Sequence, residues 1–223
     1  MPSLLSLIAP PACWCCRAAV RAGEALCGAC RVALPFLRGA RCPRCALPAP
    51  CGRRCPAAGG ALAGAWSPVA FGGPARDLVH ALKFHGARPA ADVMAAQIVA
   101  GAPAGLLAPG AVLVAVPSHP RHVRARGSDH ARLLARLVGR RTGLPVACCL
   151  TRAGPAVRQV GASRAARRAD GRLRVQVRAK PPATAVLIDD VHTTGATLQA
   201  CAVALLERGS DRVSAITYAR ALS

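Results

Sequence analysis

Apolar residues after residue 60 fall into short continuous runs that alternate with stretches of helical periodicity. The runs AVLVAV (residues 111–116) and TAVLI (184–188) lack polar alternation, which is typical of strands buried on both faces. The remaining pattern predicts shorter strands at residues 66–71, 145–150 and 212–218, a turn at 72–74, two helices within 76–101 that are interrupted at 86–89, and helices at 128–139 and 196–208. This alternation predicts an α/β fold with a mostly parallel sheet and helices on both faces.

The first 60 residues differ, because they hold nine of the twelve cysteines and little else that could form a core. Eight of these cysteines form short-spaced pairs: Cys13 and Cys16, Cys27 and Cys30, Cys42 and Cys45, and Cys51 and Cys55. Two thiolates at such spacing bind one face of a tetrahedral ion, and a second pair completes the site. The pairs therefore predict two structural Zn²⁺ sites, with the metal supplying the folding free energy.

The cysteine pattern leaves some alternatives open. A disulfide cluster is one, although the spacing and the expected reducing surroundings favour metal. Joining adjacent pairs would give two successive ribbons, whereas interleaving them would give a cross-brace. Cys15 is spare by this count, though it could replace Cys13 or Cys16. Three later cysteines are expected to be small buried hydrophobes: Cys148, Cys149 and Cys201.

The end of the cysteine pattern near Gly59 and Gly60 divides the chain. We expect a Cys-rich region at residues 1–60 and the α/β domain at residues 61–223. No uncharged run reaches the roughly 18–20 apolar residues needed to cross a bilayer, so no membrane span is predicted. The first residues lack a basic segment before their short apolar patch, which argues against a signal peptide and for a cytoplasmic location.

The chain has 30 Lys and Arg against nine Asp and Glu, a formal charge of +21. Such an excess favours polyanions such as nucleic acid, anionic lipid or phosphorylated small molecules. Residues 121–180 carry +14 of this charge, which predicts either a basic flap over an anionic ligand or a solvated loop. Only Lys83 and Lys180 are lysines, so part of the arginine excess can reflect codon bias rather than function.

The most informative motif is VLIDDVHTTGATL at residues 186–198. An apolar strand delivers Asp189 and Asp190 to the carboxyl edge of the sheet, where open α/β sheets bind ligands. The loop that follows suits a phosphate, because a glycine permits close approach, hydroxyls donate and a helix N-terminus faces the anion. Its residues are Thr193, Thr194, Gly195, Ala196 and Thr197.

Two carboxylates beside an anion site would repel the anion, unless a sugar lies between the carboxylates and the anion. Carboxylates accept hydrogen bonds from sugar hydroxyls, so Asp189, Asp190 and the loop together predict a ribose 5-phosphate site. The simpler alternative is that Thr193 or Thr194 is a helix N-cap and the acids are solvated. His192 is expected to be a surface residue without a role.

This run resembles the phosphoribosyl-pyrophosphate (PRPP) signature of type I phosphoribosyltransferases. The whole chain resembles the ComF family, which is associated with DNA uptake in competent bacteria and carries an N-terminal double zinc ribbon. The resemblance includes an L-K-F element at residues 82–84, V-P-S-H at 116–119 continuing to R-G at 126–127, and Gln159, Ser163 and Arg167. The chain departs from the family pattern R-G-F-N-Q, because Ser128, Asp129 and His130 follow Arg126 and Gly127.

The resemblance implies a type I phosphoribosyltransferase-like fold that binds PRPP with Mg²⁺. Asp189 and Asp190 would be the catalytic acids, and the pyrophosphate loop would hold Ser118, His119, Arg121 and Arg126, with Arg124 nearby. His119 is expected to be a hydrogen-bonding residue, with proton donation as the alternative. A pentosyl transferase with an unknown nitrogen acceptor is one implied function. The other is a non-catalytic competence protein that binds single-stranded DNA, senses PRPP or contacts the DNA-uptake machinery.

Overall fold

The structure, a computed structural model, describes residues 11–51, 55–119, 123–124, 127, 129–152 and 175–222. A six-stranded sheet forms its centre, and every strand pair in it is parallel. Five strands follow the order β1-β8-β7-β3-β4, and β2 pairs with the end of β8. The bounds are β1 Gly64–Trp66, β2 Val69–Ala70, β3 Val112–Ala115, β4 Val146–Ala147, β7 Thr184–His192 and β8 Arg212–Arg220.

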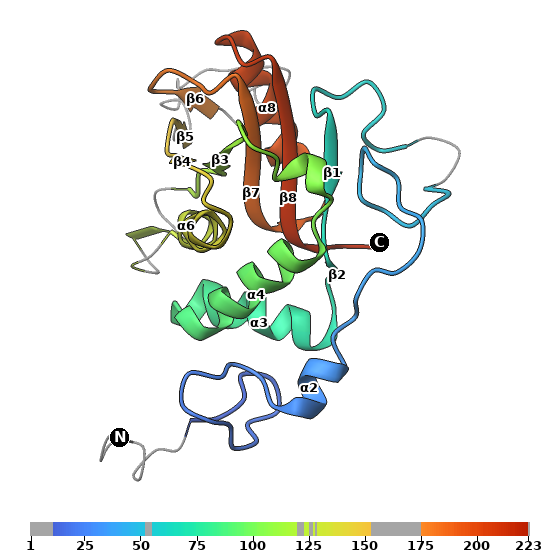
Figure 1. The fold of residues 1–223 in the computed structure, drawn as a ribbon, viewed down its shortest axis with the longest axis vertical. Coiled ribbons are helices and arrows are strands. Elements are labelled where there is room, and N and C mark those ends of the chain that lie inside the picture. The colour runs from blue at the N-terminus through green and yellow to red at the C-terminus, as the bar shows by residue number, and fades with distance from the viewer. Residues whose placement is uncertain are drawn as a thin grey trace, which may run out of the picture.

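Neighbouring residues of the central strands face opposite layers, which explains the continuous apolar runs. Leu113 and Val186 pack in a core with α3, α4 and α6, whereas Val114 and Leu187 pack in a second core with α8 (Figure 1). Helices thus cover both faces, as predicted. The bounds are α3 Gly73–His85, α4 Arg88–Gly101, the 3₁₀ turn η1 Ala104–Leu106, α6 His130–Thr142 and α8 Ala196–Glu207. Within the described ranges, no helix is both long and apolar enough to cross a bilayer.

The chain leaves β3 and β7 in opposite directions. From β3 it runs through α6 to β4, and from β7 it runs through α8 to β8 on the other side of the sheet order. The carboxyl ends of β3 and β7 therefore form a topological switch point, the place where open α/β sheets bind ligands. A separate antiparallel pair, β5 (Leu150–Arg152) and β6 (Val175–Val177), follows β4.

The cysteine-rich region packs against two parts of the α/β unit (Figure 1). The first ribbon, which holds the five cysteines from Cys13 to Cys30 and the short helix α2 (Gly28–Val32), contacts α3. Cys15 Sγ there donates to the Pro74 carbonyl at 3.6 Å. The second ribbon, which holds the four cysteines from Cys42 to Cys55, lies at the β1 edge. The Ala65 N–H of β1 donates to the Pro43 carbonyl at 2.8 Å.

Several sequence expectations need correction. The strand expected at residues 66–71 is two short strands, because Pro68 has no N–H to donate and interrupts the pairing. The expected turn at residues 72–74 already includes the start of α3, where Pro74 suits the first helical turn. Cys148 is exposed, although Cys149 and Cys201 are buried as expected.

Candidate functional site

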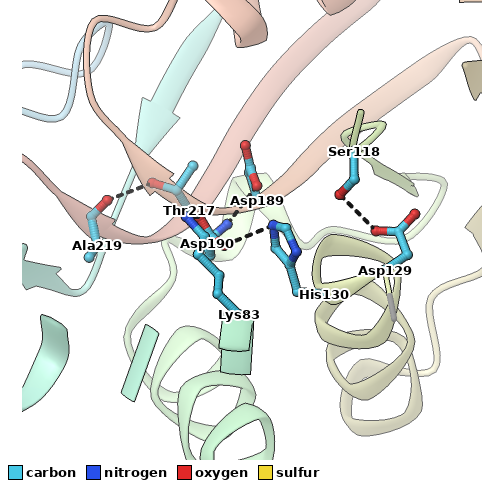
Figure 2. A network of polar contacts seen from close by, with 8 residues as sticks. All are labelled: Lys83, Ser118, Asp129, His130, Asp189, Asp190, Thr217 and Ala219. Atoms are coloured by element: carbon cyan, nitrogen blue, oxygen red, sulfur yellow. Dashed lines mark hydrogen bonds and ion pairs between the residues drawn. The ribbon is translucent and has the colours of Figure 1, made fainter. Parts of the chain in front are cut away.

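Asp189 and Asp190 lie inside β7, which continues past them to His192, instead of following the strand. Side chains alternate along a strand, so Asp190 faces the same helical layer as the buried Ile188. Figure 2 shows the convergence on Asp190. Lys83 Nζ of α3 lies 2.8 Å from Oδ1, and His130 Nε2 from the first turn of α6 lies 3.0 Å from Oδ2. Two helices distant in sequence thus meet at one buried carboxylate.

The protonation of Asp190 follows from these partners. Burial alone would raise its pKa, but the hydrogen bond and charge of His130, together with the charge of Lys83, hold the pKa below its usual range. Burial likewise lowers the pKa of His130, and its bond to Asp190 with the charges of both acids outweighs this and raises it. Asp190 is therefore an ionised carboxylate between an ammonium group and an imidazole whose protonated form is favoured.

Asp189 has a different environment. Burial, followed by the neighbouring charge of Asp190, raises its pKa to about 7, although Oδ1 accepts the Asp190 N–H at 2.8 Å. The two carboxyl pKa values are thus shifted in opposite directions, and of the two acids Asp189 is the one whose pKa lies near neutral pH. One ligand atom from each of His130, Asp189 and Asp190 lies within 4.8 Å of the other two, although the favoured protonated form of His130 could not ligate a cation.

The loop after β7 leads directly into α8 and has the features of an anion site. Gly195 caps the helix with φ of 81°, in the left-handed region that glycine adopts without strain. Thr193, Thr194 and Ala196 are exposed, and the Thr194 hydroxyl accepts the Ala196 N–H at 3.3 Å. Thr197 is half-buried in the first turn of α8. The helix N-terminus directs its partial positive charge at this exposed surface.

His192 lies buried beneath this loop, so the expectation of a surface position is wrong. The residue is 4% exposed, and its Nδ1 has no hydrogen-bond partner among the described residues. A Cβ on Gly195 would lie 2.7 Å from the His192 Nε2. The imidazole therefore occupies the space that any side chain at position 195 would need. Burial and the nearby Arg220 charge lower the His192 pKa to about 4, so it is neutral at physiological pH.

The loop after β3 lies beside the acids, because β3 and β7 are adjacent parallel strands. Ser118 Oγ donates to Asp129 Oδ1 at 3.2 Å (Figure 2). Asp129 also caps α6, because its side chain accepts the Arg132 N–H. His119 is half-buried in the same loop. This contact between the loop and the N-cap of α6 holds Ser118 on the side of the switch point from which His130 approaches Asp190.

The remaining predicted pyrophosphate-loop residues, Arg121 and Arg126, lie outside the described residues. A cavity of about 420 Å³ opens beside the loop. Its lining includes three arginines, Arg124, Arg132 and Arg152. The surroundings of this cavity are therefore strongly basic, and an anionic group would be favoured there.

The eight predicted zinc ligands form two clusters, and the sulfur atoms of each lie within 4.8 Å of one another. The first cluster joins Cys13, Cys16, Cys27 and Cys30, and the second joins Cys42, Cys45, Cys51 and Cys55. Adjacent pairs therefore share a site, which gives two successive ribbons and excludes the cross-brace. Cys15 belongs to neither cluster.

The two clusters begin with the same backbone turn. The Cys13 and Cys42 N–H groups each donate at 2.8 Å to a carbonyl five residues later, and the residues after each C-x₂-C pair, Arg17 and Ala46, have φ of 62° and 60°. Burial opposes ionisation of Cys13 and Cys42, but backbone N–H groups at the sulfurs lower both pKa values to about 6. Burial and the other thiols of each cluster raise the pKa values of Cys30 and Cys45, so without metal only part of each cluster favours the thiolate. Zinc binds thiolates and would ionise the remaining thiols, so both clusters suit structural zinc.

Sequence reasoning did not assign a site role to Lys83, His130, His192 or Arg220. The sequence analysis named Lys83 only as part of the L-K-F element, and it named His130 only because this residue departs from the family pattern. Nothing local indicates that the helix of Lys83 reaches the end of β7.

The family model described as "Double zinc ribbon domain" matches residues 4–59. This match and the two four-cysteine clusters agree, so the N-terminal region holds a double zinc ribbon. No curated protein matches the chain.

Proposed function

We propose that the switch point binds PRPP with Mg²⁺ and that the protein transfers the phosphoribosyl group to a nitrogen acceptor. One observation carries the proposal: the acid pair on β7, half-buried Asp189 and buried Asp190, is separated from a glycine-capped helix N-terminus by the end of the strand and a single short loop. A ribose 5-phosphate has its hydroxyls and its phosphate at opposite ends. It therefore suits a site with carboxylates at one end and an anion loop at the other.

In this proposal each part of the ligand meets a chemically matching group. The 5-phosphate binds at Thr193–Thr197, and the ribose hydroxyls donate to the acid pair, chiefly to Asp189, because Lys83 and His130 already contact both oxygens of the buried Asp190. The pyrophosphate lies near Ser118 and His119, with Arg121 and Arg126 as further cationic partners. The basic lining of the neighbouring cavity supports an anion on that side.

The donor set also suits Mg²⁺, which prefers oxygen ligands and keeps several waters. Asp189 is the better candidate for such a contact, because both oxygens of Asp190 already meet cationic partners. Bound Mg²⁺ would neutralise charge on the pyrophosphate as it leaves. The protein's own contribution is orientation and electrostatic stabilisation while a nitrogen attacks ribose C1 and pyrophosphate departs.

A second candidate function is a non-catalytic role in DNA uptake, with PRPP sensed rather than consumed. The net charge of +21 favours it, because single-stranded DNA is the polyanion that such a role requires. Pyrophosphate release in the presence of PRPP, Mg²⁺ and a panel of nitrogen bases separates the two candidates. Release that depends on one base supports the transferase, and binding without release supports the second role.

Calorimetry with PRPP and Mg²⁺ tests the site itself. Gly195→Val should abolish binding, because its side chain would collide with the buried His192 imidazole and β-branching disfavours the left-handed conformation, so the loop backbone that must approach the phosphate is displaced. Gly209→Val is the matched control, since Gly209 has φ of 101° beyond the other end of α8 with open space around it. If Gly195→Val binds PRPP as tightly as wild type, the site assignment is wrong.

A further inference from the structure

Arg220, the last residue of β8, links the second ribbon to the start of the loop at residues 193–197, the proposed phosphate loop. Its Nε donates to the Cys45 carbonyl at 2.8 Å. Its Nη1 lies 2.8 Å from the His192 carbonyl and 2.6 Å from the Thr193 carbonyl. The residue is only 4% exposed, so water cannot easily replace these bonds. One side chain therefore ties a predicted zinc ligand to the residues that open the loop.

The positive charge of the buried Arg220 explains why this side chain lies beside a zinc cluster. Within the described part of the chain no carboxylate pairs with the guanidinium, which is bonded to carbonyl groups alone. Four thiolates around one Zn²⁺ carry a net charge of 2−, and Cys45 of that set lies against Arg220. A loaded second ribbon therefore supplies the negative charge that a buried cation requires.

We propose that Arg220 is a positioning residue through which zinc in the second ribbon fixes the phosphate loop and thereby sets its affinity for a phosphorylated ligand. Zinc holds Cys45, the Cys45 carbonyl orients the guanidinium, and the guanidinium holds the His192 and Thr193 carbonyls. Among the described residues, no hydrogen bond joins the first ribbon to the loop, and its polar and ring contacts with the α/β unit include those of Cys15 and Trp14 with α3. The two ribbons thus have different roles, and only the second acts on the loop.

The affinity part of this inference rests on the proposed function, so its test includes a measurement that needs no ligand. Hydrogen exchange of the peptide covering residues 190–198 is compared in the full chain for wild type, Arg220→Lys and Cys55→Ser, with zinc content determined for each. Arg220→Lys keeps the charge but loses the planar fork that reaches several carbonyls at once. Arg212→Lys, at the exposed start of the same strand, is the matched control.

We expect at least tenfold faster exchange of this peptide in Arg220→Lys and in Cys55→Ser, and wild-type exchange in Arg212→Lys and in Cys16→Ser of the first ribbon. PRPP affinity, measured by calorimetry, should fall at least tenfold in the same two variants. Unchanged exchange in Arg220→Lys overturns the inference, even if Cys55→Ser fails to fold. If wild type does not bind PRPP, the proposed function fails, while the exchange data still decide whether Arg220 holds the loop.

Discussion

At the scale of single residues, the buried imidazole of His192 makes the loop sensitive to acid. A histidine in the unfolded chain titrates near 6.5, whereas burial beneath Gly195 and the Arg220 charge lower the folded-state pKa to about 4. Between these values the unfolded state binds more protons, so the free energy of unfolding must fall as the pH is lowered from about 6.5 to about 4.

Replacing His192 with leucine should remove this contribution. Between pH 7 and pH 5, wild type should lose about 2 kcal/mol more unfolding free energy than His192→Leu, as measured by urea titration at each pH. His130 is present in both proteins, so its own titration contributes equally to the two pH dependences and cancels in the comparison. Its raised pKa stabilises the fold below the unfolded value near 6.5, and that contribution is lost as the pH rises. Equal losses in both proteins would show that His192 is not buried neutral.

A second residue-scale prediction concerns the ion pair of Lys83 with Asp190. Lys83→Met leaves a buried carboxylate with His130 alone, and removing one partner of a buried pair costs about 3–5 kcal/mol. Because His130 remains and Lys83 is partly exposed, we expect a loss of about 2–3 kcal/mol. Arg141→Met is the control, since its pair with Asp92 is largely exposed and should cost less than about 1 kcal/mol. Similar losses in the two variants would contradict the buried pair.

At the scale of elements, the sequence predicted well what local pattern determines. The buried runs became β3 and β7, and the interruption near Gly86 separates α3 from α4, where Gly86 caps α3 in the left-handed conformation. The eight predicted ligands also gather in two four-cysteine clusters that support structural zinc, because the geometry of zinc knuckles depends on short spacing. The predicted end of the strand at residue 188 was wrong, because β7 continues to His192. Neighbouring acids usually end a strand, but Lys83 and His130 neutralise Asp190, and they belong to helices that only the tertiary fold brings there.

The burial of the cysteines and the two zinc clusters predict that thiols react in two steps, first one exposed cysteine and then the zinc ligands. Cys148 is exposed, whereas burial raises the pKa values of Cys149, Cys201 and Cys15. In zinc-loaded protein, a disulfide reagent should therefore modify about one thiol per chain rapidly, and Cys148→Ser should remove this phase. A chelator should release about two Zn²⁺ and expose about eight further thiols. Less than half an equivalent of zinc in protein purified under reducing conditions would contradict the ribbon assignment.

At the scale of the whole molecule, the candidate site is assembled from distant parts of the chain. The sheet supplies the acids, α3 and α6 supply their cationic partners, and α8 supplies the loop. The second ribbon reaches the same loop through Arg220. No single segment contains this site, so the sequence motif indicated its acids and loop, whereas only the fold shows the cationic partners of Asp190.

The net charge of +21 permits a test of DNA binding that does not depend on this site. Each phosphate neutralised on a single strand contributes a slope of about −0.7 to the log–log salt dependence of affinity. Neutralising Arg164, Arg167 and Arg168, which lie outside the described residues, should therefore flatten the slope by about 2 if the 121–180 span binds DNA. Aromatic residues make up 3% of the chain, so sequence preference should be weak.

The matched control is a triple substitution at exposed arginines outside that span, Arg38, Arg76 and Arg88. Both triples remove the same formal charge, so any general effect of net charge acts on them equally. Only a localised DNA site makes the slope respond more to the first triple, with fluorescence anisotropy of a labelled oligonucleotide as the measurement. Equal flattening would mean that the DNA contacts the whole basic surface. An unchanged slope in both would mean that the arginine excess does not contribute to DNA binding and that the second candidate function loses its support.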